Sequence, residues 1–130
     1  MEITQKQAFK SLDQAIKKAN EIGVNANITI LDTAGHIKAF TRMDDAFLGS
    51  IDISMGKAKT AMLFRMNSEA VGEFLNPENK THGMVNTSGG LVGFKGGVPV
   101  KSGSETVAYI GVSGGTPDQD FEIATAGSEI

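Results

Sequence analysis

The stretch TVAYIGVSGGTPDQD, residues 106–120, decides the fold, because it holds a strand, a turn and a helix start in direct succession. Residues 107–112 are almost continuously apolar, which indicates a buried strand. Thr116 and Gln119 have the spacing of a capping box, and Pro117 stands at the first helical position, where its missing N–H costs nothing. The stretch therefore predicts a buried strand that turns through glycines into the last helix.

The N-terminal third predicts a helix followed by a hairpin. A second capping-box pair, Thr4 and Gln7, precedes apolar residues at three-to-four spacing, and Gly23 supplies the helix stop. Two alternating runs, residues 25–32 and 36–42, are joined by the turn sequence Asp-Thr-Ala-Gly. That arrangement is typical of two strands in a hairpin.

The middle of the chain predicts two helices and a second hairpin. Residues 50–64 carry an apolar stripe at helical spacing, in which methionines are expected to fill core positions, and Ser50 can cap this helix. A short extra helix is expected over residues 68–75. Residues 91–94 and 98–100, separated by Lys-Gly-Gly, predict two paired strands.

These elements give the order α-β-β-α-(α)-β-β-β-α. The order predicts one domain over residues 1–130, of the α+β class, with an antiparallel sheet of about five strands and helices packed on it. A chain of 130 residues is long enough to bury its own core without a metal or disulfide.

Composition excludes several classes of function. The net charge is −3, with 12 basic and 15 acidic side chains well mixed, so nucleic acid is not expected as a partner. The sequence holds no cysteine, which removes disulfides, thiolate catalysis and cysteine metal sites. No apolar run approaches the roughly 20 residues of a membrane span, and the first residues lack a signal core. We therefore expect a soluble, cytoplasmic protein with no membrane partner.

Three stretches together resemble the GlcG/HbpS-like family, which includes haem-binding proteins and the C-terminal domain of some corrinoid adenosyltransferases. They are ILDTAGH with RMDDA at residues 30–36 and 42–46, KAKTA at residues 57–61, and YIGVSGGTPDQD at residues 109–120. The resemblance implies a profilin-like fold, a homo-oligomer that is often an octamer, and binding of haem, a cobalamin-related group or another small ligand. The chain departs from the family pattern at Asp45, where glycine is usual.

The glycine corner is one candidate ligand site. Backbone N–H groups of Ser113, Gly114, Gly115 and Thr116, at a helix start, can hold a carboxylate or a phosphate. The other interpretation is that a strand needs small residues to turn into a helix. The spacing does not match a dinucleotide-binding fingerprint.

A second candidate combines Arg42, Asp44 and Lys57. Arg42 and Asp44 are two residues apart at a strand end, so their side chains point the same way, and Lys57 lies on the following helix. The two cations could clamp an anion while Asp44 orients the arginine. The favoured alternative is a structural ion pair that ties the hairpin to the helix, or that lies across a subunit contact.

The two imidazoles, His36 and His82, are the candidate axial ligands for haem iron. His36 follows the turn glycine and can equally be an exposed strand residue, whereas His82 lies in a loop that could fold over a pocket. No nucleophile–base pair is present in the pattern. Asp44 and Asp45 are expected to form a solvated turn, and Asp118 and Asp120 a favourable helix start, rather than acid–base pairs. No catalytic residue is therefore predicted.

The sequence predicts a small-ligand-binding protein, with haem as the cofactor that the resemblance suggests. Two alternatives stay open. One is an enzyme or accessory protein that acts on small organic acids or diols, and the other is a ligand-free assembly module in which the polar motifs build subunit contacts.

Overall fold

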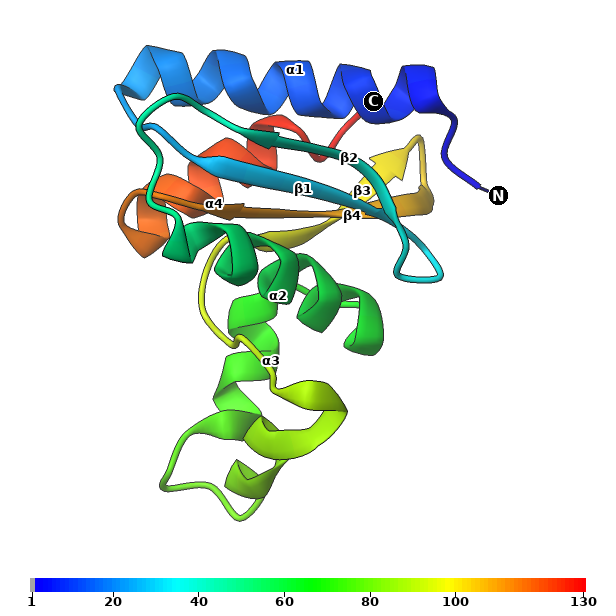
Figure 1. Cartoon of the computed structure of the whole chain (residues 1–130). Coiled ribbons are helices and arrows are strands. Elements are labelled where there is room, and N and C mark those ends of the chain that lie inside the picture. The colour runs from blue at the N-terminus through cyan, green and yellow to red at the C-terminus, as the bar shows by residue number, and fades with distance from the viewer. Residues whose placement is uncertain (1) are drawn as a thin grey trace.

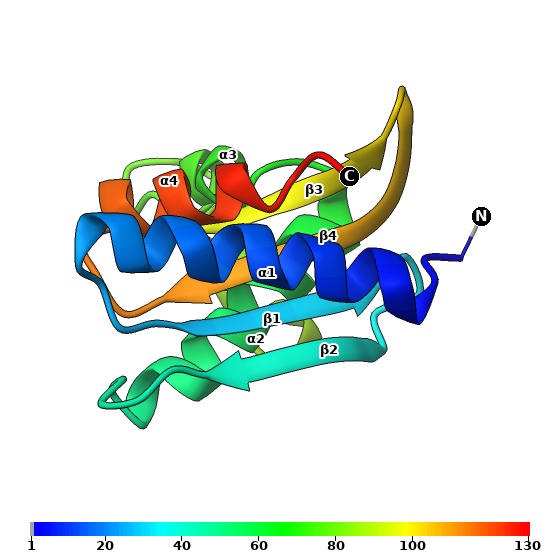
Figure 2. The same cartoon turned by 90° about the horizontal axis from the view of Figure 1, so that it is seen from above.

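The fold is one antiparallel sheet with helices on both faces (Figures 1 and 2). The computed structural model describes residues 2–130. The four strands lie in the order β2-β1-β4-β3. The elements are α1 (Gln5–Ile22), β1 (Asn27–Asp32), β2 (Ile37–Arg42), α2 (Gly49–Phe64), α3 (Ser68–Leu75), the 3-10 segment η1 (His82–Gly89), β3 (Gly97–Ser102), β4 (Glu105–Ser113) and α4 (Pro117–Ala126).

The alternation of side chains along β1 assigns the two faces of the sheet. Ile28 and Ile30 are fully buried in the core that the sheet forms with α1 and α4. The alternate residue Thr29 bonds Ser54 of α2 on the other face, with 2.9 Å between the two hydroxyl oxygens. Figure 1 shows α1 and α4 above the sheet and α2 below it. The two central strands, β1 and β4, are therefore buried on both sides.

Both predicted capping boxes are present. Thr4 and Thr116 each accept a hydrogen bond from the backbone three residues on, and Gln7 and Gln119 accept in return from the cap backbone. Gly23 ends α1 in the left-handed conformation, at φ 72°. The α+β class is confirmed, because the structure consists of helices packed on one antiparallel sheet.

The expected strand at residues 91–94 is wrong, and the sheet has four strands where about five were expected. The N–H of Leu91 donates to Val85 O in η1, and that of Val92 donates to the Thr60 hydroxyl of α2. Because these two N–H groups bond partners outside the sheet, residues 91–94 run as a loop against α2 and α3. β3 pairs with β4 instead, with Val98 opposite Ile110.

The predicted buried stripe of α2 also needs correction. Its fully buried side chains are small or polar, and Met55 and Met62 are only half-buried. The physical reason is the close approach of α2 to β4, where a Cβ on Gly111 would overlap the Ser54 carbonyl oxygen. Ser50 does not cap the helix either, because the cap position is Leu48 and makes no side-chain cap bond.

Beyond α2, α3 and η1 form a lobe that projects from the layered part of the molecule (Figure 1). Gly72 of α3 packs closely against the segment that leads from η1 to β3, since a Cβ on Gly72 would overlap the Gly93 carbonyl oxygen. Within residues 2–130, every helix is too short or too polar to span a lipid bilayer.

Candidate functional site

The glycine corner and the lysine of α2 meet in a buried ion pair. Lys57 is fully buried, and its Nζ lies 3.0 Å from Asp120 Oδ2 of α4 and 2.9 Å from Val112 O at the end of β4. The same ammonium lies 4.5 Å from the centroid of the Phe94 ring. The other carboxylate oxygen, Asp120 Oδ1, accepts from Gly115 N at 2.8 Å. All these groups are thus satisfied by one another.

Burial shifts both partners toward their neutral forms. It raises the pKa of Asp120, while the Gly115 N–H and the Lys57 ammonium act in the lowering direction. It lowers the pKa of Lys57, and Asp120 opposes that shift. The environment therefore holds a charged pair at a desolvation cost, as is usual for buried ion pairs.

Asp118 and Asp120 lie in the first turn of α4, as expected for a favourable helix start, but Asp120 is buried. Asp118 is exposed and pairs with Lys95 at 2.7 Å. The difference follows from position, since residue 120 lies one turn beyond Thr116 and faces the corner. The sequence signal was a lone lysine on a helix face otherwise lined with small residues, which requires a buried anion.

The N–H groups of the predicted anion site have partners within the chain. Gly115 N donates to Asp120, and Thr116 N donates to Gln119 Oε1 at 2.9 Å. Ser113 is buried, whereas Gly115 and Thr116 are exposed. Anion binding by residues 113–116 stays a prediction, and an incoming anion would compete with these internal bonds.

Arg42 and Asp44 lie at the exposed end of β2 and make no contact with the Lys57 ammonium, whose partners are given above. Arg42 is opposite Asn27 in the sheet, and Asn27 is opposite Ser113, so these three side chains share the face toward α2. The strand end and the glycine corner therefore lie on one face of the sheet, on either side of β1. The ammonium of Lys57 is closed off from both by its own pairing.

Asn27 was missed by the sequence reasoning. It is fully buried, and its Nδ2 donates to Phe47 O at 2.9 Å. Its Oδ1 has no hydrogen-bond partner within residues 2–130. The signal was available, because an asparagine opening a buried strand needs polar partners.

The two histidines have different surroundings. The ring of His36 is 80% exposed and lies 3.5 Å from the Asp32 carboxylate. The shallow hollow beside it is polar and is lined by Glu2, Asp32, Thr33 and Ala34.

His82 begins η1 in the projecting lobe. Its Nδ1 lies 2.7 Å from Leu75 O. A carbonyl oxygen only accepts, so Nδ1 carries the proton and Nε2 keeps its lone pair. The flanking residues Thr81 and Met84 line a cavity of about 310 Å³ whose other walls are Phe64, Met66, Val71 and Phe74.

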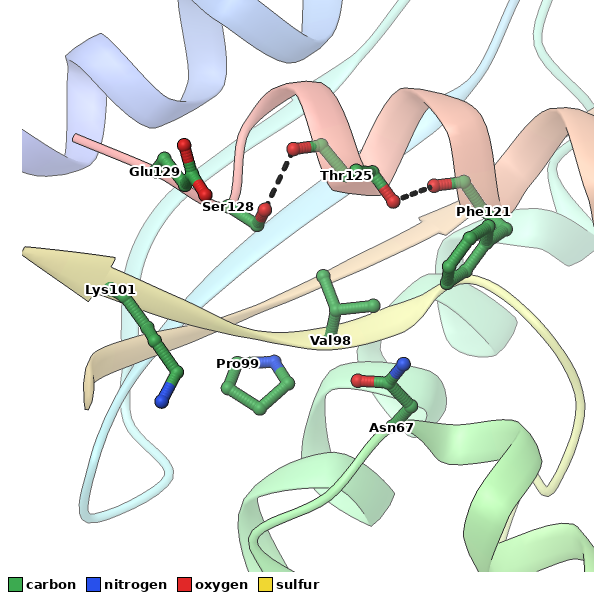
Figure 3. Close-up of a pocket in the computed structure, with 8 residues that line it drawn as sticks. All are labelled: Asn67, Val98, Pro99, Lys101, Phe121, Thr125, Ser128 and Glu129. Carbon is green, nitrogen blue, oxygen red and sulfur yellow. Dashed lines mark hydrogen bonds between the residues drawn. The ribbon is translucent and has the colours of Figure 1, made fainter. Parts of the chain in front are cut away.

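A third hollow, of about 320 Å³, lies between β3 and the end of α4 (Figure 3). The C-terminal residues close the outer edge of β3 here: Lys101 N donates to Ser128 O, and Ile130 N donates to Lys101 O. Pro99 has no N–H to offer at that edge. The hollow has a mixed lining of apolar, polar and charged residues, among them Phe121, Lys101 and Glu129, and no histidine is among its lining residues.

Taken together, the fold defines a class of small α+β domains in which helices cover both faces of one antiparallel sheet. Within that class, the chain belongs to the HbpS-like family, because the family model described as haem degrading protein HbpS-like matches residues 3–129. The resemblance to GlcG/HbpS-like proteins is thereby confirmed. The Escherichia coli K12 protein GlcG is 31% identical over 111 residues, which cover 85% of this chain and 81% of GlcG.

Other relatives span most of the chain. An uncharacterized 15.0 kDa protein in the dhaT-dhaS intergenic region of Citrobacter freundii is 37% identical over 119 residues, or 90% of this chain and 84% of that protein. The crystal structure of Klebsiella pneumoniae protein ORFY matches at a TM-score of 0.89 and 31% identity, covering 96% of this chain and 87% of that one. A PduOC:heme complex has the same fold, at a TM-score of 0.89 and 24% identity, covering 98% of this chain and 93% of that one.

Proposed function

We propose that this chain binds haem at the apolar cavity beside His82, with the imidazole Nε2 as the axial ligand. The observation that carries the proposal is that His82, whose Nδ1 is bonded to Leu75 O, lies next to residues that line an apolar cavity. Membership of a family described as haem-degrading, and the heme complex known for a protein of the same fold, support the choice of ligand.

The orientation of His82 suits a metal ligand. Haem iron accepts a neutral imidazole nitrogen, and a ligating histidine usually donates its other N–H to a carbonyl or carboxylate. The bond from Nδ1 to Leu75 O meets that requirement before any ligand arrives. The side chain is exposed, so Nε2 is open to an incoming group.

The cavity supplies what a porphyrin face needs. Its walls include two phenylalanines and two methionines, and its volume is at the small end of the range for ligand pockets, about 300–1,000 Å³. Phe74 is 46% exposed at its rim, so an apolar ring seated there would bury surface that now meets water. These residues would hold part of the porphyrin, and the iron would supply the redox chemistry.

His36 does not fit the same role. The carboxylates of Glu2 and Asp32 line its hollow, and they would repel the propionates of haem. An apolar wall is also lacking there. His36 is therefore the matched control.

The test is a hemin titration followed by absorbance in the Soret region. The wild-type spectrum should shift and saturate at a fixed ratio of hemin to protein. His82→Gln should weaken binding at least tenfold, whereas His36→Gln should leave it unchanged. Met84→Glu, which places a charge in the cavity wall, should weaken it as well. An unsaturable, linear shift, or equal binding by His82→Gln and wild type, would overturn the proposal.

We also infer that the protein works as a homo-oligomer in the cytoplasm, with an octamer as the specific expectation. Several large apolar side chains are exposed on the single chain, which supports self-association. The lack of cysteine supports a reducing compartment.

A further inference from the structure

We propose that residues 42–48, the corner loop between β2 and α2, form a self-complementary surface that docks a second copy of this chain across a two-fold axis. Figure 2 shows β2 at the edge of the sheet and the corner loop beyond the end of that strand. The proposal rests on the homo-oligomer inferred above and names the surface through which copies associate, and it does not depend on haem binding.

The corner loop is held in one shape. Met43 N donates to Ala26 O at 3.0 Å, and Ala46 N donates to Met43 O at 3.1 Å. The buried amide of Asn27 holds Phe47 O. Asp45 has a left-handed backbone, at φ 64°, which is uncommon for a residue other than glycine. A loop fixed in this way loses little conformational entropy when it docks.

The corner loop nevertheless exposes apolar surface. Phe47 is 70% exposed and Leu48 is 67% exposed, the two highest values among the large apolar residues of the described chain. Their backbone is tied down while their side chains point to water. An adjacent aromatic and leucine at the centre of a rigid patch are the expected anchor of an interface.

Charges of both signs surround this apolar pair. Arg42, Asp44 and Asp45 are exposed, and none of them forms an ion pair within residues 2–130. In a two-fold contact, residue i of one copy meets residue j of the other and the reverse contact forms as well. Arg42 of each copy can therefore meet Asp44 of the other, and both charges gain a partner.

This charge pattern favours a second copy over a different protein. A patch that carries both signs around an apolar centre is complementary to itself. Pairing of the β2 edges in the register centred on Phe40 is disfavoured, because it would place Lys38 opposite Arg42. The contact therefore belongs to the corner loop and not to the strand edge.

The experiment exchanges charges between copies and measures mass by light scattering at fixed protein concentration. Wild type should have a mass that is a multiple of 13.7 kDa. Arg42→Asp alone and Asp44→Arg alone should each reduce that mass at least twofold, because like charges then meet in the homodimer. An equimolar mixture of the two variants should regain it, since each contact in the mixed pair again joins opposite charges. Pairing within one chain cannot produce recovery on mixing.

Matched controls lie on α1, away from the corner loop. Lys10→Asp and Asp13→Arg change the same charges at exposed positions and should keep the wild-type mass. A further variant, Phe47→Ser with Leu48→Ser, should reduce the mass without lowering the thermal midpoint, which separates loss of docking from loss of folding. A monomeric wild type, unchanged masses for the single variants, or a mixture that stays dissociated would each overturn the proposal. A wild-type monomer that captures a different protein through this loop would overturn the choice of partner.

Discussion

Lys57 of α2 and Asp120 of α4 form an ion pair, 3.0 Å from Nζ to Oδ2, that joins the helical layers on the two faces of the sheet. The lysine passes the end of β4, where Val112 O accepts its second hydrogen bond. The side chains are 0% and 3% exposed, so solvent screens neither charge. The helices on the two faces of the sheet are thus connected directly, by an ion pair beside the end of β4.

Removing one member of this pair should be costly. Lys57→Met leaves the Asp120 carboxylate buried without its cation, and we expect a loss of about 3–5 kcal/mol in the free energy of unfolding. Asp120→Asn should also destabilise, because it strands the ammonium. Urea denaturation of each variant measures these losses.

The double variant tests whether the two residues act as a pair. Lys57→Met with Asp120→Asn should lose less than the sum of the single losses, by about 1–3 kcal/mol. Strictly additive losses would show that each residue is held by its other neighbours and that the pair itself contributes nothing.

Sequence patterns predicted the elements whose signals are local. The capping boxes at Thr4 and Thr116 and the apolar run that became β4 depend only on near neighbours, and all three are confirmed. The pairing of Lys57 with Asp120 spans 63 residues, so the residues around Lys57 indicate a buried anion but do not identify Asp120 as that anion. The strand expected at residues 91–94 failed for the same reason, since its donors are taken by distant partners on α2 and η1.

The sequence named candidate site residues, but their surroundings depend on contacts between distant segments. The sequence nominated Arg42 and Ser113 separately, and the strand register places them on either side of Asn27. The sequence nominated both histidines equally, and it could not separate them, because the surroundings of His82 depend on the Leu75 carbonyl seven residues earlier and on a cavity built from α2, α3 and η1. Whether that cavity takes haem stays a prediction.

Gly111 should tolerate no side chain. A Cβ there would overlap Ser54 O and lie 2.7 Å from Ala58 N, both of them backbone atoms of α2. Gly111→Ala must push α2 off the sheet, and we expect a loss of more than about 2 kcal/mol from overpacking. Gly49→Ala is the control, because a Cβ at that helical position meets nothing within 4 Å, and it should be neutral or stabilising by up to about 1 kcal/mol. Equal midpoints in thermal melts of the two variants would contradict this packing argument.

Ser68 should anchor the projecting lobe to the edge of β3. Its hydroxyl accepts from Gly97 N at 2.9 Å and donates to Phe94 O at 2.5 Å, in a buried setting. Ser68→Ala leaves a buried N–H without an acceptor, which should cost about 1–3 kcal/mol.

Hydrogen exchange at the Gly97 amide provides a local measurement of that loss. Its protection should fall in Ser68→Ala. The exposed Ser128 hydroxyl bonds Thr125 O, so Ser128→Ala should change stability by less than about 0.5 kcal/mol. Unchanged protection at Gly97 would mean that another group, or water, accepts its hydrogen bond.

The turn between β1 and β2 should depend on pH through Asp32. Burial acts to raise the pKa of this carboxyl, but the N–H groups of His36 and Ala34, each 2.9 Å from Oδ1, outweigh it and hold the pKa below the ordinary value of 3.8. A carboxylate with a lowered pKa contributes stability at pH above its unfolded-state pKa, and that contribution disappears as pH falls through the folded-state pKa.

Asp32→Asn keeps the shape of the side chain and loses its charge, so the variant should be about 1 kcal/mol less stable than wild type at pH 7. The difference should vanish in acid, once the pH is below the lowered folded-state pKa of Asp32. Urea denaturation across this range checks the sign, with Asp13→Asn, an exposed position on α1, as the control. A stability gap that widens as the pH falls would contradict the assignment of this turn to a charge-assisted pair of backbone hydrogen bonds.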